Sequence, residues 1–118
     1  MSDIKIIPLL VGIGSFFIAH VLTFFQLNGQ FLYKSFQKHE WAVAAAGVVL
    51  SFFYIWGTKY TVEVFSGLLW PGRFIGFGVG MVIYAIMVSY FFNEGINLKT
   101  MTSLILATGL VCVQVFWK

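Results

Sequence analysis

Charge is what this sequence has least of. Seven of its 118 residues are Lys or Arg and four are Asp or Glu, so 9% of the chain is charged. In an average soluble domain, about a quarter of the residues are charged. A chain that is 60% hydrophobic therefore has too little polar surface to cover a globule in water. This shortage excludes an ordinary soluble domain and indicates that lipid covers the outside.

Side chains that perform chemistry are also scarce. Cys112 is the single cysteine, so no disulfide framework is expected, and His20 and His39 lack the spacing of metal ligands. No glycine-rich phosphate loop with a lysine occurs. We therefore expect neither an enzyme nor a metalloprotein, and no cofactor. The net charge of +3, spread over membrane loops, suits lipid headgroups better than a nucleic acid.

Long apolar runs are what the sequence has instead. A membrane span needs roughly 20 mostly apolar residues, and runs of this length satisfy their backbone hydrogen bonds as helices. Four such runs cover residues 6–26, 41–60, 71–92 and 100–117. Trp41, Trp70 and Trp117 lie near the ends of runs, as in the aromatic belts of membrane proteins. The predicted fold is an all-α membrane protein, with residues 1–118 forming one bundle of four transmembrane helices in the cell membrane.

The cations are divided almost evenly between the two membrane faces. Four spans put both termini and the link between the second and third helices on one face. That face carries Lys5, Lys59, Arg73 and Lys118. The opposite face carries Lys34, Lys38 and Lys99. Because an excess of Lys and Arg normally fixes orientation, this balance predicts insertion in both orientations and an antiparallel dimer. The alternative is one orientation, decided by a single charge or by a partner protein.

Residues 76–111, GFGVGMVIYAIMVSYFFNEGINLKTMTSLILATGLV, resemble the C-terminal half of small multidrug resistance transporters, within the drug/metabolite transporter superfamily. The features shared with that family are the Gly-Val-Gly at Gly78–Gly80, Phe91-Phe92, the acidic loop at 93–98 and the Gly-Leu-Val at Gly109–Val111. The resemblance implies an antiparallel homodimer that moves small solutes by alternating access. It also implies that the fourth helix forms the dimer contact, with Ile105, Gly109 and Val113 on one face.

Glycines of the third run have physical meaning without the family. Gly72, Gly76 and Gly80 recur every four residues, so they share a helix face that another backbone can approach closely. Gly78 adds a bare position between them and permits a kink. One reading is that these glycines only help helices to pack. The other is that Gly76, Gly78 and Gly80 also form a hinge, as alternating access requires.

His20 lies within the almost wholly apolar segment FFIAHVLTFF. Transporters of the resembling family carry a membrane-embedded glutamate here, and its absence removes the site that would exchange protons for lipophilic cations. An imidazole changes its charge near neutral pH. Polar groups at such depth usually face a bundle interior or an aqueous cavity and mark a function. The alternative is a structural histidine, hydrogen-bonded to Thr23, Ser15 or another helix.

Arg73 is a candidate partner for His20 in substrate binding. The resemblance places it where a substrate-facing tyrosine is usual, and its planar fork of donors suits a carboxylate or a phosphate. Alternatively, it is a helix-end arginine that extends to the interface. Tyr84 and Tyr54 are further candidates to line a cavity, although Tyr54 fits helix packing equally well.

The leading hypothesis is a membrane transporter that works as a homodimer by alternating access and carries a small anionic or zwitterionic solute. Its partners are the solute, the bilayer and a second copy of the chain, and no nucleic acid. Three alternatives remain open at this point. They are proton-coupled efflux of cationic compounds, a lipid-carrier flippase subunit in a heterodimer, and a scaffold that transports nothing.

Overall fold

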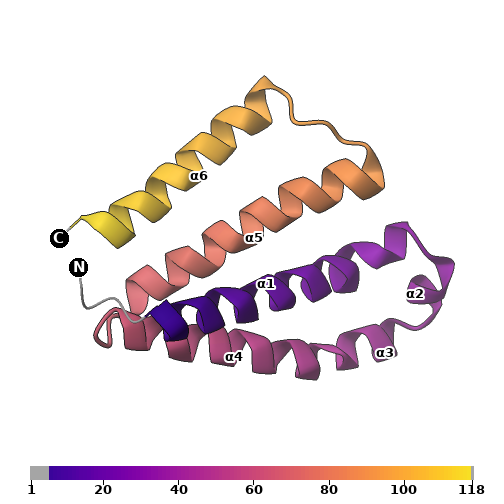
Figure 1. The fold of residues 1–118 in the computed structure, drawn as a ribbon. Helices are drawn as coiled ribbons and strands as arrows, with labels where there is room; N and C mark the ends of the chain where they lie inside the picture. Colours follow the sequence, from indigo (N-terminus) through magenta and orange to yellow (C-terminus); the bar gives the residue numbers. More distant parts are fainter. Residues whose placement is uncertain (1–5, 118) are drawn as a thin grey trace.

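The computed structural model describes residues 6–117, and every regular element in that range is a helix (Figure 1). The elements are α1 (Ile6–Asn28), η1 (Gly29–Phe31), α2 (Lys34–Lys38), α3 (Glu40–Ala45), α4 (Gly47–Val64), α5 (Leu69–Phe92) and α6 (Leu98–Phe116). Four spans in this range are long and apolar enough to cross a membrane, namely Ile6–Phe31, Glu40–Val64, Leu69–Phe92 and Leu98–Phe116. The prediction of an all-α membrane protein with four spans is confirmed. Lys5 and Lys118, two of the cations used to predict topology, lie outside the described residues.

Two helix ends are set by asparagine. Asn97 accepts a hydrogen bond from the Thr100 amide at 2.8 Å, which caps the first turn of α6 and starts it at Leu98. Asn93 adopts the left-handed conformation, with φ 54°, and so ends α5. The start of α5 is two residues earlier than predicted, at Leu69. Pro71 is therefore the third helical residue, still within the turn whose amides have no helical acceptor.

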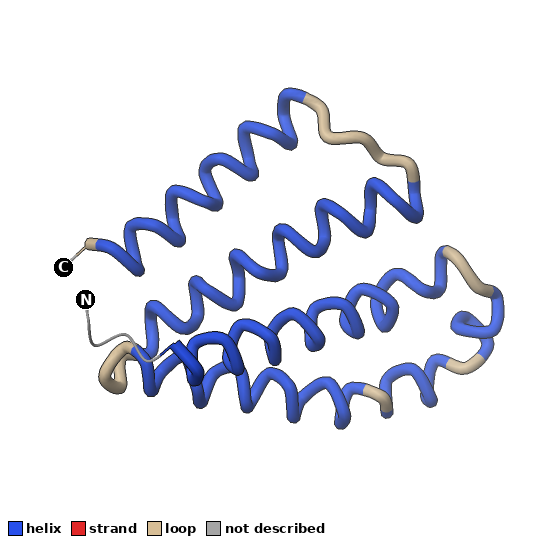
Figure 2. Tube along the Cα trace, viewed as in Figure 1, coloured by secondary structure: helices blue, strands red, loops and turns tan. Residues whose placement is uncertain are grey.

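The region between the first two spans is more helical than predicted (Figure 2). The expected link contains the short helix α2 (Lys34–Lys38), whose five polar or aromatic residues give no apolar periodicity to detect. The expected helix at 41–60 is two helices, α3 and α4, joined at Ala46, and α4 continues to Val64. The prediction located this span and allowed its continuation toward Phe65, and it missed the break at Ala46.

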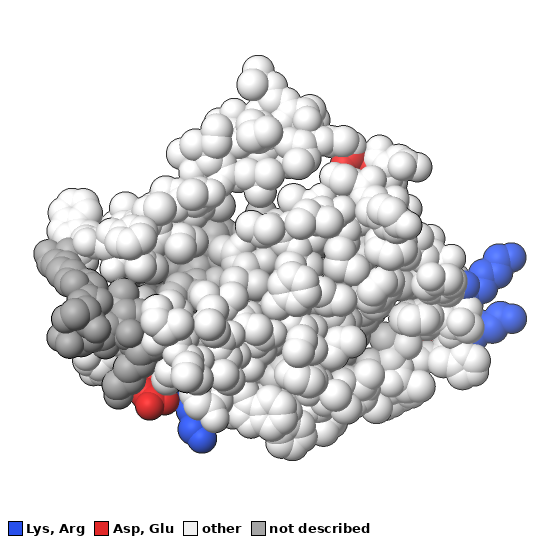
Figure 3. Space-filling model, in the orientation of Figure 1, with Lys and Arg blue, Asp and Glu red and all other residues white. Residues whose placement is uncertain are grey.

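Three of the four spans form a packed unit. Helices α1, α4 and α5 lie against one another, whereas α6 packs chiefly on α5 and diverges from the other two (Figure 1). Buried residues follow the same division, with five in α1, three in α4, four in α5 and only Ala107 in α6. On the face shown in Figure 3, basic side chains are visible at one end of the molecule and at its lower left edge, and none is visible between them. The core therefore lies between α1, α4 and α5.

Candidate functional site

The glycine face of α5 receives side chains from the neighbouring helices. A Cβ atom at Gly72 would meet Thr61 Oγ1 at 2.7 Å, one at Gly76 would meet the Phe16 ring at 3.2 Å, and one at Gly80 would meet the His20 ring at 2.6 Å. Distances under 3 Å are closer than real Cβ contacts allow. The bare backbone of α5 therefore lets α1 and α4 approach closely, as the four-residue spacing predicts.

Gly78 lies on another side of α5. A Cβ there would meet Val111 of α6 at 3.0 Å, so Gly78 belongs to the α5–α6 contact. Helix α5 is continuous from Leu69 to Phe92 through all of these glycines. Close packing accounts for the positions of Gly76, Gly78 and Gly80, and their additional role as a hinge stays a prediction.

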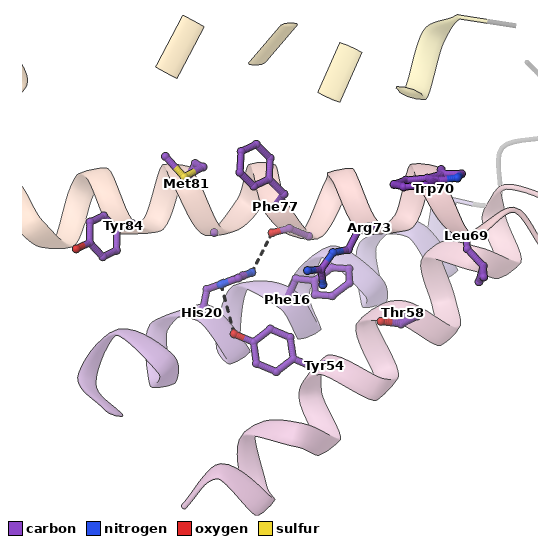
Figure 4. A pocket seen from close by; sticks show the side chains of 12 residues that line it. Phe16, His20, Tyr54, Thr58, Leu69, Trp70, Arg73, Phe77, Met81 and Tyr84 are labelled. Atoms are coloured by element: carbon purple, nitrogen blue, oxygen red, sulfur yellow. Dashed lines mark hydrogen bonds between the residues drawn. The ribbon is translucent and has the colours of Figure 1, made fainter. Parts of the chain in front are cut away.

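His20 joins three helices through hydrogen bonds (Figure 4). Its Nε2 lies 2.9 Å from the carbonyl oxygen of Gly76 in α5. Because a carbonyl only accepts, Nε2 carries the proton and donates it, which leaves Nδ1 of a neutral ring as an acceptor. The Tyr54 hydroxyl of α4 lies 3.4 Å from Nδ1 and 2.7 Å from Thr23 Oγ1. The absence of a side chain at Gly80 allows this ring to reach the carbonyl one turn away.

Of the three hydrogen-bond partners suggested for a structural His20, the structure shows only one as a direct partner. Ser15 donates to the Val11 carbonyl of its own helix at 2.8 Å. Thr23 reaches His20 only through the Tyr54 hydroxyl. The main partner, the Gly76 carbonyl, belongs to another helix, which matches the third suggestion.

A cavity of about 970 Å³ opens beside His20, at the upper end of the range for small-molecule sites. Its lining comes from α1, α4 and α5 and consists of Phe16, His20, Tyr54, Thr58, Leu69, Trp70, Arg73, Gly76, Phe77, Gly80, Met81 and Tyr84. The structure thus brings together all four predicted substrate-binding residues, His20, Arg73, Tyr84 and Tyr54, around one hollow. No Asp or Glu of the described residues lines it. Whether these residues bind a substrate stays a prediction.

Arg73 gives the cavity its positive charge. Its side chain is exposed and makes no hydrogen bond or ion pair with any residue in the range 6–117. In Figure 4 it extends from α5 to the side on which His20 and Tyr54 lie. The guanidinium therefore faces the cavity with its five donors unused within the described part of the chain.

Tyr84 lies at the opposite end of this cavity from Thr58 and Arg73 (Figure 4). It also lines a second hollow of about 430 Å³, together with Asn28, Phe31, Val88, Phe92 and Glu94. Its ring packs edge-on against Phe24 at 5.8 Å, and Phe24 in turn packs against Phe91 and Phe92. This aromatic cluster adjoins the end of the main cavity that is remote from Arg73.

Six residues that line the main cavity were not predicted, and a spacing of four residues would have pointed to some of them. Phe16 lies four residues before His20 and therefore shares its helix face. Met81 follows Phe77 by four residues, and the two side chains extend to the same side of α5 (Figure 4). Thr58 gave no signal of its own, since it lies in α4 and meets the cavity only through the helix crossing.

The predicted dimer face of α6 is uncovered within the protomer. Ile105 is 63% exposed and Val113 is 48% exposed. A Cβ atom at Gly109 would meet nothing within 4 Å. These three residues lie apart from the cavity, and dimerisation through them stays a prediction.

Comparison with protein-family models, curated proteins and solved structures finds no match to this chain, so the case for its function rests on its own residues.

Proposed function

We propose that this chain is a small multi-pass transporter of the cell membrane that works as a homodimer by alternating access and carries a small anionic or zwitterionic solute. The observation that supports this most is a cavity between membrane-spanning helices that holds an arginine without a protein partner among the described residues and no carboxylate. Buried or intramembrane charges are costly unless they are paired. A bound anion would supply the missing partner of Arg73. The cost of removing water from the anion would be offset by two parallel hydrogen bonds from the guanidinium.

His20 adds a second source of positive charge in this proposal. When its ring gains a proton, Nδ1 becomes a donor to the Tyr54 oxygen, and the Tyr54 hydroxyl then donates to Thr23. Every group in the chain of hydrogen bonds keeps a partner in both states. The cavity can therefore become more positive without leaving a polar group unpaired, which would couple anion binding to protonation.

The homodimer supplies the second half of the proposal. The even division of cations favours copies inserted in opposite orientations. Two such copies are related by inverted symmetry, so states open to either side have nearly equal energy and modest binding energy shifts the balance. The exposed face at Ile105, Gly109 and Val113 is the surface through which we propose they pair.

Transport by purified protein in liposomes tests the function. We expect uptake of an anion such as benzoate, at least tenfold slower uptake of a matched cation such as benzylammonium, and at least tenfold loss of benzoate uptake in both Arg73→Gln and His20→Ala. His39→Ala is the matched control, because His39 lies between α2 and α3 and outside the cavity. Faster uptake of the cation would favour proton-coupled efflux of cationic compounds. An absence of any flux would favour the scaffold.

Labelling of introduced cysteines tests the topology. The native Cys112 is exposed, so Cys112→Ala is the required background. Single cysteines at Gln30 and Gly95 lie in connections on the same predicted face. Modification of each from both sides of the membrane supports dual orientation, and modification from one side only removes the antiparallel dimer.

A further inference from the structure

The main cavity combines one ionic side chain with walls that are mostly apolar. Its apolar side chains are Phe16, Leu69, Trp70, Phe77 and Met81. In Figure 4, Phe77 and Met81 extend from α5 to the side away from His20, whereas Phe16 lies beside Arg73, so apolar side chains are present on both sides of the hollow. A ligand that fills such a space must present apolar surface over most of its length.

The polar groups at mid-depth are already engaged with one another. His20 uses Nε2 on the Gly76 carbonyl and Nδ1 on the Tyr54 hydroxyl, and that hydroxyl also bonds Thr23. They offer a ligand few free donors or acceptors. A small hydrated anion drawn to this depth would lose its water and find little to replace it.

Free polar groups are found instead at the ends of the cavity, the Tyr84 hydroxyl at one end and Arg73 with Thr58 at the other, and of these only Arg73 carries a charge. Arg73 and the Thr58 hydroxyl make no hydrogen bond with other residues of the described range. Figure 4 shows these two side chains at the same end of the hollow, on facing helices α5 and α4. Arg73 lies four residues inside the start of α5, about 6 Å along the axis and therefore close to the membrane boundary.

We infer that the ligand of this cavity is an amphiphilic anion, with its carboxylate or phosphate on Arg73 and Thr58 and its apolar body along Phe16 and Phe77 toward Tyr84. The inference rests on the proposed function, since it names the substrate class of the same site. An amphiphile of this kind keeps its charge near the membrane boundary and pairs it with the guanidinium. Its apolar body meets the walls that a small hydrophilic anion would leave without partners.

Equilibrium binding of radiolabelled octanoate tests the inference. The protein is placed in phosphatidylcholine nanodiscs, and empty nanodiscs measure the octanoate that partitions into lipid. We expect saturable binding whose affinity rises with chain length from butanoate to octanoate, by up to roughly fourfold for each methylene that enters the cavity. Acetate and inorganic phosphate should compete at least tenfold more weakly than octanoate, and so should octanol, which has the chain without the charge.

Variants locate the site. Arg73→Gln should weaken octanoate binding at least tenfold, and Thr58→Val should weaken it severalfold, because charged groups make the strongest hydrogen bonds. Lys59→Gln is the matched control, since it removes a neighbouring cation that does not line the cavity, and we expect a change within about twofold. Should Arg73→Gln fail to fold, Thr58→Val and Arg73→Lys test the same contact with smaller changes.

The outcomes separate this inference from the proposed function. Equal binding of acetate, inorganic phosphate and octanoate would overturn the amphiphile, as would tighter binding of octyltrimethylammonium or no saturable binding at all. Octanoate binding without flux in liposomes would support the inference and remove the transporter. Flux of small anions without dependence on chain length would keep the transporter and remove the amphiphile.

Discussion

The two sides of α5 are packed in different ways. On the side of α1 and α4, glycines accept side chains at close range and His20 donates to a carbonyl of the neighbouring helix. On the side of α6, Gly78 faces the aliphatic side chain of Val111, and Thr102, Ser103 and Thr108 each donate to a carbonyl of their own helix. In lipid no hydrophobic force holds helices together, so shape and interhelical hydrogen bonds must do so. The first side is therefore specified more strongly than the second, which leaves α6 suited to pair with another copy.

The largest effect is expected from filling the close contact at Gly80. In Gly80→Ala, the new Cβ would lie 2.6 Å from His20 Cε1 and 2.8 Å from Nδ1, so the ring must move and its bond to Gly76 is lost. We expect destabilisation of about 1–3 kcal/mol, typical of overpacking, measured as a lower unfolding midpoint in detergent. Gly14→Ala is the control, because nothing lies within 4 Å of its Cβ position and alanine favours helix. Equal midpoints for the two variants would show that α1 and α5 are not closely packed.

A smaller effect is expected on the α6 side. In Gly109→Ile, the added side chain meets nothing within the protomer, so the unfolding midpoint of the monomer should stay close to that of the wild type. If α6 pairs with a second copy, the same change should weaken dimerisation by about tenfold, because small residues allow helices in membranes to approach closely. Energy transfer between labelled protomers in liposomes measures this equilibrium. A dimer unaffected by Gly109→Ile would place the interface elsewhere.

The helices and the glycine spacing were predictable from the sequence because they depend on local pattern. Apolar length marks the four spans, and a repeat of four marks the face of Gly72, Gly76 and Gly80 whatever that face meets. The partners of His20 were not predictable in the same way. The contact between His20 and Gly76 joins residues 56 positions apart and depends on how α1 crosses α5. The same crossing decides that Thr58 lines the cavity, and no local pattern around that threonine indicates it.

The smallest effect is expected from the hydrogen-bond chain itself. Tyr54→Phe removes the hydroxyl that links Thr23 to His20 while keeping the ring edge-on to the imidazole at 5.4 Å. Interhelical hydrogen bonds in membranes contribute about 0.6 kcal/mol on average, so we expect a loss of stability near that size. A double-mutant cycle with Thr23→Val isolates the pair, because each single change removes the same bond and a coupled pair gives less than additive loss. Thr108→Val is the control, since that hydroxyl bonds only its own helix. Additive losses of stability for the Tyr54 and Thr23 variants would mean that this series of hydrogen bonds does not hold α1 to α4. The contrast between the two sides of α5 would then rest on the glycines and on the hydrogen bond from His20 to Gly76.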